Sequence, residues 1–348
     1  MSTPDKVQAF CERFRLRVPL LLAPMAGVSP SSLSIAVMQA GGMGACGALL
    51  MQAEAIGSWV REVRAQSHGP FNLNLWIPEA SPPRDVAHEN LLRIFLGRWG
   101  PELGLDAGNA TPPDFASQCA ALLEAKPRVI SSVMGLYPPA FVQEMKSRGI
   151  TWFANVSTVG EALAAEAAGA DVIVAQGMEA GGHRGCFDGA LAETQLVGLF
   201  ALLPAIVDAV HLPVVATGGI ADARGVAAAM ALGASAVQIG SGFMRCPEAN
   251  LPSAWADAMA KARPEDTVLT RAFSGRAGRS LRTPYVQAAS AADAPHAAPY
   301  PVQRSLTAPM REAAVKANDV QRMQAWAGQA SYLAQAIPAA EVMSQLWP

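Results

Sequence analysis

The sequence predicts an α/β protein built as a (β/α)8 TIM barrel, with a small, mostly helical lobe made by an insertion and the C-terminal part of the chain. Short apolar runs without alternation recur along the chain, as expected for strands that are buried on both faces. Helical segments end at glycines such as Gly149, Gly169 and Gly233, and a strand-like run follows each within a residue or two. Eight such runs suit a closed parallel barrel, with a doubly wound open sheet as the alternative.

Helix-start signals separate the expected strands. Ser29-Pro30 offers a cap and a first-turn proline, Thr158 and Glu161 form a capping box, and Asp222 opens a further helix. The run 42–47 matches G-x-G-x-x-G, but it follows a helix and occupies the next strand, so it does not indicate a dinucleotide site. The expected strands are residues 20–23, 43–47, 71–75, 129–132, 151–154, 171–175, 214–217 and 236–239.

Two stretches are too long for ordinary βα connections. We interpret residues 77–126 as an elaborated loop and helix after the third strand, and residues 247–310 as a lobe over the barrel mouth. A last helical pattern runs from Arg311 to Gln335. The expected parts are therefore a barrel core at 1–246, the small lobe at 247–310, and a C-terminal helical segment at 311–348 that packs on the barrel.

Composition and charge exclude several classes of protein. The 348 residues are 51% hydrophobic and 16% charged, which predicts a substantial buried core. The net charge is −2 and no Lys/Arg block occurs, so we expect neither nucleic acid nor a membrane surface as partner, while a homodimer stays open. Charges near the N-terminus in place of a signal peptide, and apolar stretches too short to cross a bilayer, predict a soluble cytoplasmic protein.

Metal and disulfide sites are not expected. The five cysteines are scattered and lack Cys-x-x-Cys spacing, which argues against a disulfide framework or a zinc site. No cluster of histidines or paired carboxylates predicts a metal. Glu179, Asp188 and Asp222 are interpreted as solvated or capping residues, without a catalytic role.

The segment most informative about function follows the sixth expected strand. It contains Gln176, Gly181, Gly182 and His183, at the rim where the loops of a barrel converge on the catalytic site. Glycines let backbone N–H groups approach an anion, and a histidine can move protons near neutral pH. A solvent-facing histidine in a turn is the alternative, but the position at a strand end favours a functional role.

Glycines also follow the last two expected strands. The corresponding loops of a barrel commonly form a phosphate pocket from backbone amides. Either glycine pair alone is a weak signal, but together at adjacent strand ends they favour a phosphorylated ligand. The residues concerned are Gly218, Gly219, Gln238, Ile239, Gly240 and Ser241.

The ends of the first and third strands complete the candidate site. Ala23, Pro24 and Met25 end the first, and the third contains Asn72 and Asn74. Amide side chains suit a flat heterocycle because they donate and accept hydrogen bonds in one plane. Either asparagine could equally satisfy buried backbone groups, and Met25 fits packing better than chemistry.

These segments resemble the nitronate monooxygenases, formerly called 2-nitropropane dioxygenases, and especially their bacterial, class I-like members. The resemblance spans nearly the whole chain. Its specific parts are residues 23–28, 39–44, 71–74, 176–185 and 238–241, with the C-terminal segments 272–276, 306–309 and 326–329.

The resemblance implies a barrel that binds FMN at its mouth and oxidises alkyl nitronates, with nitroalkanes left open, using O2 and releasing a carbonyl compound and nitrite. His183 matches the family's active-site histidine, as a base or as an anchor for the nitronate. Ser241 stands where threonine is common. The other implied contacts are Asn74 and Gln176 with the isoalloxazine, Gly181, Gly182, Gly218 and Gly219 with the ribityl phosphate region, and Gln238 to Ser241 with the phosphate.

Two alternatives remain open. One is an FMN-dependent NAD(P)H reductase of the same superfamily, either a quinone reductase or the enoyl-acyl-carrier-protein reductase, which shares the Glu-x-Gly-Gly-His signature at 179–183. The chain lacks a basic run for docking a carrier protein and has the monooxygenase-like tail. The other alternative is a flavin-binding protein without turnover.

Overall fold

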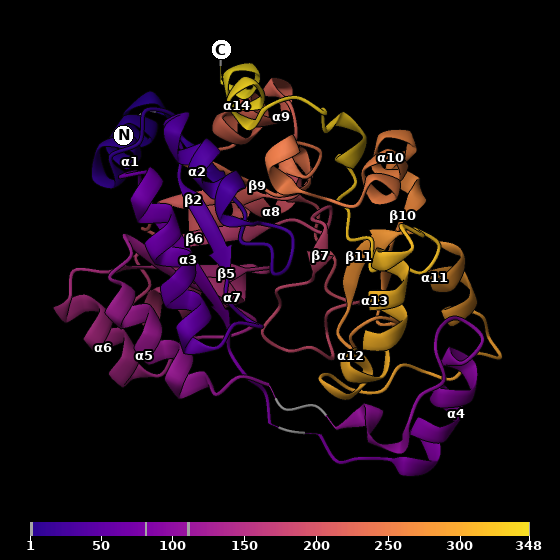
Figure 1. Ribbon diagram of the computed structural model, residues 1–348. Helices are drawn as coiled ribbons and strands as arrows, with labels where there is room; N and C mark the ends of the chain where they lie inside the picture. The colour runs from indigo at the N-terminus through magenta and orange to yellow at the C-terminus, as the bar shows by residue number, and fades with distance from the viewer. Residues whose placement is uncertain (1–2, 81, 110–111, 348) are drawn as a thin grey trace.

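Eight parallel strands form the centre of the structure, a computed structural model that describes residues 3–80, 82–109 and 112–347 (Figure 1). Their order around the sheet is β1-β9-β8-β6-β5-β4-β3-β2, and a bridge between Leu21 and Met43 joins β1 to β2 and closes the barrel. All eight predicted strands are confirmed, with ends that differ by at most two residues. They are β1 (Leu20–Leu22), β2 (Gly44–Gly47), β3 (Phe71–Trp76), β4 (Val129–Val133), β5 (Thr151–Val156), β6 (Val172–Gln176), β8 (Val214–Thr217) and β9 (Ala236–Ile239).

Helices surround the barrel and cover the outer face of its strands. Seven of them follow strands in the βα order that the sequence predicts. These are α2 (Ser31–Gln39), α3 (Ala53–Gln66), α5 (Phe115–Ala125), α6 (Pro139–Ser147), α7 (Val159–Ala167), α8 (Leu199–Ala209) and α9 (Ala223–Ala231). After β9 the chain leaves the barrel, and α14 (Ala339–Leu346) returns to pack against α2 and α9, where the eighth helix of the outer ring belongs (Figure 1).

Two of the three predicted helix starts are confirmed. Thr158 accepts a hydrogen bond from Glu161 N at 3.1 Å, and Asp222 accepts one from Gly225 N at 3.0 Å. The Glu161 carboxylate, however, binds the N–H of Ser157 and not that of Thr158, so the predicted capping box is only half formed. The prediction for Ser29 is wrong, because its hydroxyl bonds to the Met25 carbonyl and Pro30 is the N-cap of α2.

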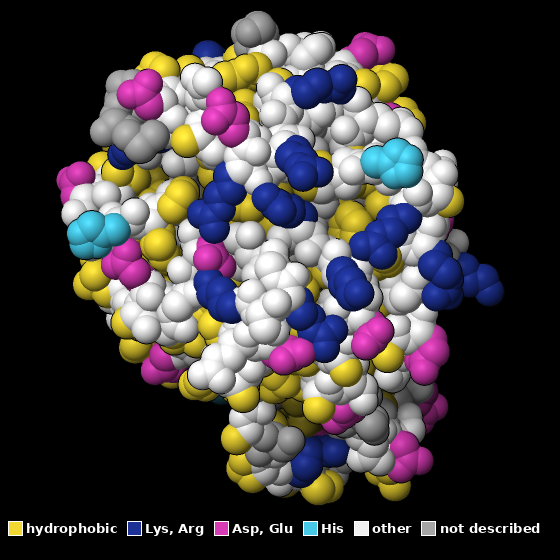
Figure 2. Space-filling view, turned by 90° about the vertical axis from the view of Figure 1, so that its left-hand side faces the viewer, with side chains coloured by type: hydrophobic (Ala, Val, Ile, Leu, Met, Phe, Trp, Pro, Cys, Tyr) yellow, Lys and Arg dark blue, Asp and Glu magenta, His cyan; other side chains and the backbone are white. Residues whose placement is uncertain are grey.

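The N-terminal helix α1 (Thr3–Phe14) closes the end of the barrel where the strands begin. Phe10 and Phe14 insert beside Phe153 of β5, with ring centroids 5.2 Å apart for Phe14 and Phe153. Figure 2 looks onto this end and shows Lys and Arg side chains gathered on it. Its exposed arginines, such as Arg17 and Arg148, come from different loops that each precede a strand. Because these loops are far apart in the sequence, no continuous basic segment predicted this face.

The lobe combines C-terminal segments with part of the insertion after β3. Leu92 and Leu96 of α4 (Val86–Leu96) pack with Phe273 and Tyr285 of the lobe in one apolar cluster. Figure 1 shows α4 beside this lobe, away from the barrel. The remaining elements of the lobe and its surroundings are η1 (Leu105–Gly108), η2 (Ser241–Phe243), η3 (Pro247–Ala249), α10 (Ser253–Lys261), η4 (Pro264–Asp266), α11 (Pro284–Ala289), α12 (Val302–Leu306), α13 (Ala308–Lys316) and η5 (Ser331–Leu333).

A second, antiparallel sheet was not predicted. It consists of β10 (Thr267–Thr270), β11 (Gly278–Leu281) and β7 (Gly182–His183), and it joins the lobe to the loop after β6. The helical pattern expected from Arg311 to Gln335 is also wrong beyond Lys316, where α13 ends and turns follow. The division of the chain at residues 246 and 310 stays a prediction, and its outermost residues, 1–2 and 348, lie outside the described residues.

Candidate functional site

A cavity of about 450 Å³ lies at the C-terminal ends of the strands, between barrel and lobe. This volume is within the range of roughly 300–1,000 Å³ that is usual for small-molecule sites. Of the residues predicted for the site, Ile239 does not line the cavity, because its side chain packs in the barrel core. Those that do line it are Ala23, Pro24, Met25, Asn74, Gln176, Gly181, Gly182, His183, Gly218, Gly219, Gln238, Gly240 and Ser241.

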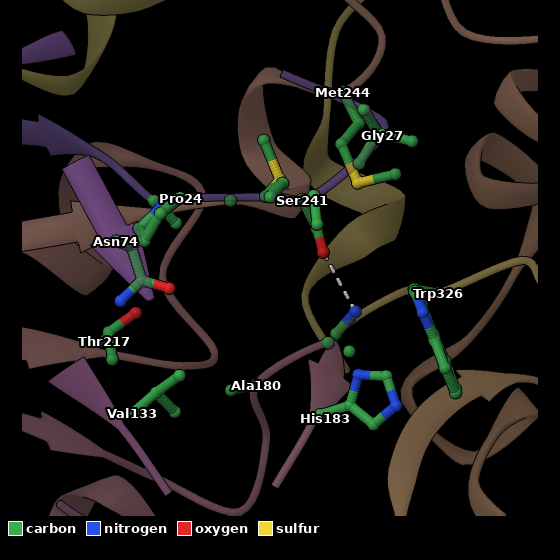
Figure 3. Close-up of a pocket in the computed structure, with 18 of the residues that line it drawn as sticks. Pro24, Gly27, Asn74, Val133, Ala180, His183, Thr217, Ser241, Met244 and Trp326 are labelled. Carbon is green, nitrogen blue, oxygen red and sulfur yellow. Dashed lines mark hydrogen bonds between the residues drawn. The ribbon is translucent and has the colours of Figure 1, made fainter. Parts of the chain in front are cut away.

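His183 is fixed in the cavity wall by β-sheet pairing of its backbone and by contacts of its ring. Its backbone pairs with Gly278 of β11, and its ring makes edge contacts with Trp76 and Trp326, at centroid distances of 4.6 and 4.9 Å. Figure 3 shows Trp326 beside the imidazole. Nε2 lies 2.7 Å from Ser274 Oγ, whereas Nδ1 bonds to no described residue and is the nitrogen left for a ligand.

The surroundings of His183 keep its ring neutral. Burial lowers its pKa to about 3, and the positive charges of Arg276, Arg304 and Arg311 contribute to the lowering. Arg276 forms an ion pair with Glu79 at 3.1 Å, but the guanidinium of Arg304, which lines the cavity, has no hydrogen bond or ion pair to any described residue. An unpaired guanidinium beside a neutral histidine makes this part of the cavity suitable for an anion.

Gln176 holds the loop that carries His183. Its Oε1 accepts a hydrogen bond from Gly185 N at 2.7 Å, and its Nε2 lies 3.3 Å from the carbonyl oxygen of His183. Both ends of this amide are therefore engaged by the protein. The predicted contact of Gln176 with a flavin ring stays a prediction, beside this observed role in the loop.

Other amide groups in the cavity are free for a ligand. Asn74 Nδ2 donates to Ser131 Oγ at 2.9 Å, while its Oδ1 bonds to no described residue. Asn155 Nδ2 is buried without a hydrogen-bond partner, and its residue lines the cavity. Between Asn72 and Asn74, only Asn74 reaches the cavity. Unpaired amide atoms around an enclosed space suit a flat ring with several polar edges.

Glycines bring backbone groups together in the opposite part of the cavity. Gly218 and Gly219 have φ angles of +109° and +70°, which other residues rarely adopt. A Cβ on Gly181 would lie 2.5 Å from Gly328 N, and that N–H donates to Ser241 Oγ at 3.0 Å (Figure 3, dashed line). The N–H groups of Gly219 and Ser241 have no acceptor among the described residues, so they can bind an anionic group such as a phosphate.

Several residues that line the cavity were not predicted. Some of them, such as Thr217 and Asn155, belong to barrel strands, and another group comes from the lobe, which folds back over the mouth. The sequence signal for the lobe was the family-like segments 306–309 and 326–329, to which no role had been assigned. The lobe residues include Tyr300, Arg304, Arg311, Met323, Gln324, Trp326 and Gly328.

The carboxylates and thiols near the site have structural roles. Glu179 accepts hydrogen bonds from Leu199 N, the first residue of α8, at 2.9 and 3.0 Å, as a capping residue does. Asp188 is exposed and accepts a hydrogen bond from Ala190 N of a turn at 2.8 Å, so it is solvated and caps no helix. The Cys186 thiol donates to Asp188 O, and burial raises its pKa. All five cysteines are unpaired.

The described part of the chain contains no group of three or more His, Cys, Asp or Glu side chains placed to hold a metal ion. Within the same residues, no helix combines the length and apolar character needed to span a membrane.

Comparison with known sequences gives a consistent result. A family model described as nitronate monooxygenase matches residues 8–348. The nitronate monooxygenase of Paraburkholderia phytofirmans is 37% identical over 339 residues, which cover 94% of this chain and 91% of that protein. The nitronate monooxygenase of Pseudomonas aeruginosa is 36% identical over 342 residues, which cover 97% of both chains.

Two solved structures share the architecture of this chain. Nitroalkane oxidase from Streptomyces ansochromogenes has a TM-score of 0.89 at 34% identity, over 97% of this chain and 96% of that one. FabK from Thermotoga maritima has a TM-score of 0.75 at 27% identity, over 97% and 94%.

Proposed function

The chain belongs to the nitronate monooxygenase family, and from this premise we propose that it binds FMN in the cavity at the barrel mouth and oxidises small nitronates with O2 to a carbonyl compound and nitrite. The observation that carries the proposal is the neutral His183 with a free Nδ1, next to the unpaired Arg304, in a cavity rich in unpaired amides. Bound flavin supplies the electron acceptor and the reaction with oxygen.

The choice of FMN rests on the size and the donors of the cavity. Asn74, Asn155 and Gln238 provide amide groups for the edge of a planar ring, and the backbone N–H groups of Gly219 and Ser241 suit its phosphate. A volume of about 450 Å³ lies toward the small end of the usual range, which favours a mononucleotide over a dinucleotide.

Three groups of the chain act on the substrate in this proposal. Arg304 attracts and orients the anion, His183 Nδ1 meets the nitro group, and Trp76 and Trp326 exclude water around them. A histidine whose pKa is about 3 is a weak base, so it is poorly suited to remove a proton from a neutral nitroalkane. The site therefore favours nitronates, which have already lost that proton.

A reductase is the second candidate, because FabK shares the architecture. Figure 2 shows Lys and Arg side chains gathered at the closed end of the barrel, so an acidic carrier docked on them would lie at the end opposite to the cavity. This placement favours the monooxygenase.

We further propose a homodimer in the cytoplasm, which size-exclusion chromatography with light scattering and cell fractionation can test.

Anaerobic flavin reduction tests the proposal. One portion of the purified protein is denatured, and its released flavin is identified by chromatography. The other portion is mixed in the absence of oxygen with ethyl nitronate or with NADH. We expect FMN, rapid bleaching by ethyl nitronate, and no bleaching by NADH. Bleaching by NADH alone would identify the protein as a reductase, and absence of flavin would overturn both candidate functions.

A further inference from the structure

A second cavity of about 380 Å³ lies beside the first one. The two cavities share Leu49, Trp76 and Tyr300 as lining residues. The rings of Trp76 and Tyr300 meet at a centroid distance of 5.3 Å, and Trp76 also contacts His183, at 4.6 Å. The second cavity therefore begins one aromatic ring beyond the imidazole.

The walls of the second cavity are mainly apolar, and they include Ile77, Pro78, Phe115, Pro301 and Val302. The insertion after β3 and the lobe supply most of these residues. No comparable set of free amides occurs here. This lining therefore differs in chemistry from that of the first cavity.

Every charged side chain that lines the second cavity is already neutralised. Arg276 pairs with Glu79 at 3.1 Å, and Arg84 Nη2 bonds to Glu89 Oε2 at 2.6 Å. Two amides of the wall also bond to the protein, since Gln118 Nε2 donates to Met51 O at 2.8 Å and Asn109 Oδ1 accepts from Arg84 Nη1 at 2.9 Å. Because its charges are paired and its walls are mainly apolar, this space favours an uncharged, apolar occupant.

The first cavity leaves little room for the carbon chain of a substrate. FMN is itself a drug-sized ligand, and a cavity of about 450 Å³ is largely filled by one such molecule. His183 is enclosed by Trp76 and Trp326, so a chain attached to the nitro carbon must pass one of these rings. Only the passage at Trp76 leads toward the second cavity.

The partition between the cavities consists of the Trp76 and Tyr300 rings, which are held by packing alone. Neither the Trp76 indole N–H nor the Tyr300 hydroxyl has a hydrogen bond to a described residue, so no polar contact fixes either ring. A change of side-chain rotamer at these two residues would widen the passage between the cavities.

We propose that the second cavity receives the aliphatic tail of the substrate, and that the chain prefers nitronates with an unbranched tail of several carbons. The nitronate end lies at His183 and the tail passes between Trp76 and Tyr300. This inference rests on the proposed function and adds to it the class of substrate.

A chain-length series tests the proposal in the holoenzyme. We expect kcat/KM to rise from ethyl to hexyl nitronate by roughly fourfold for each methylene that enters the second cavity. Ala80→Trp, which fills that cavity from its rim, is expected to abolish this rise and leave ethyl nitronate unaffected, while Ala80→Ser keeps the wild-type series. A flat series in the wild type, or a rise that survives Ala80→Trp, would overturn the inference.

A binding measurement separates this inference from the proposed function. In crystals of the holoenzyme soaked with 6-bromo-1-nitrohexane, we expect the anomalous signal of bromine inside the second cavity. Bromine elsewhere would overturn the inference, even if ethyl nitronate bleaches the flavin and the proposed function stands. Bromine in the second cavity of a protein whose flavin no nitronate reduces would support an apolar-tail site and reject the nitronate chemistry.

Discussion

Ser274 Oγ lies 2.7 Å from His183 Nε2, and at 3.2 Å it also reaches the carbonyl oxygen of Arg276. A serine hydroxyl has one proton and so donates to only one of these acceptors at a time. When it donates to Nε2, the proton of the imidazole resides on Nδ1, which then faces the cavity as a donor. The shorter distance and an anionic substrate both favour this arrangement, in which His183 anchors the nitronate.

Replacing Ser274 should weaken that anchor without removing the cofactor. We expect Ser274→Ala to lower kcat/KM for ethyl nitronate by roughly threefold to tenfold, the usual contribution of one hydrogen bond to a polar partner. Ser274→Thr keeps the hydroxyl and serves as the matched control. Nitrogen-15 chemical shifts of labelled histidine should report the proton on Nδ1 in the wild type and on Nε2 in Ser274→Ala; the same tautomer in both would contradict the assignment.

Replacing His183 should separate binding of flavin from turnover. We expect His183→Asn to lower kcat/KM by roughly 100-fold or more, because the neutral imidazole is the group placed to meet the nitro group. The visible absorbance of the bound flavin should remain. A variant that keeps both its colour and its activity would exclude His183 from the reaction.

The lowered pKa of His183 predicts how stability depends on pH. The folded protein keeps this ring neutral down to about pH 3, whereas the ring of the unfolded chain takes up a proton below its ordinary pKa of 6.5. The unfolded state thus binds more protons between these values, so the free energy of unfolding should fall as the pH decreases from 6.5 toward 3.

Urea titrations at pH 7, 5.5 and 4.5 measure this contribution. His183→Asn carries no titrating ring, so its loss of stability over the same interval should be smaller than that of the wild type. Equal losses in both proteins would show that His183 titrates normally in the folded state.

Removing the charge of Arg304 should weaken binding of the anion. We expect Arg304→Gln to raise KM for ethyl nitronate roughly tenfold or more, the scale of a hydrogen bond to a charged group. Arg61→Gln, at an exposed position on α3, is the control and should leave KM unchanged. An unchanged KM in Arg304→Gln would place the substrate elsewhere in the cavity.

The closed end of the barrel should matter for stability and not for chemistry. Phe14 is fully buried against Phe10 and Phe153, so we expect Phe14→Ala to reduce the free energy of unfolding by about 3–5 kcal/mol. Phe200→Ala removes a ring that is 75% exposed and should change it by less than about 0.5 kcal/mol. Similar values for the two variants in urea titrations would contradict the packing of α1.

The barrel could be predicted because its local signals agree with its packing. Strands such as β6 are buried on both faces and therefore read as uninterrupted apolar runs, and the helices end at glycines. The segment after Lys316 misled the prediction because an Ala- and Gln-rich sequence has the composition of a helix whether or not it forms one. The small sheet was missed because β7 pairs with β11 across almost a hundred residues of sequence.

The candidate site was predictable only where it lies on barrel loops. Gly218, Gly219 and His183 follow strands, so their place at the mouth follows from topology alone. Ile239 was included because it adjoins Gln238, but neighbouring residues of a strand point to opposite faces, and Ile239 packs in the core. Trp326 and Arg304 reach the cavity through the fold of the lobe, which no local pattern describes.

The place of α14 in the outer ring has a consequence for biosynthesis. A nascent chain that has left the ribosome as far as residue 246 contains all eight barrel strands but lacks the helix that covers α2 and α9. The apolar surface of α2 and α9 that Val342, Met343 and Leu346 later bury is then exposed to water and to chaperones. Because Trp326 and Gly328, which line the cavity, are also still missing, we expect stable capture of flavin to follow translation of these segments.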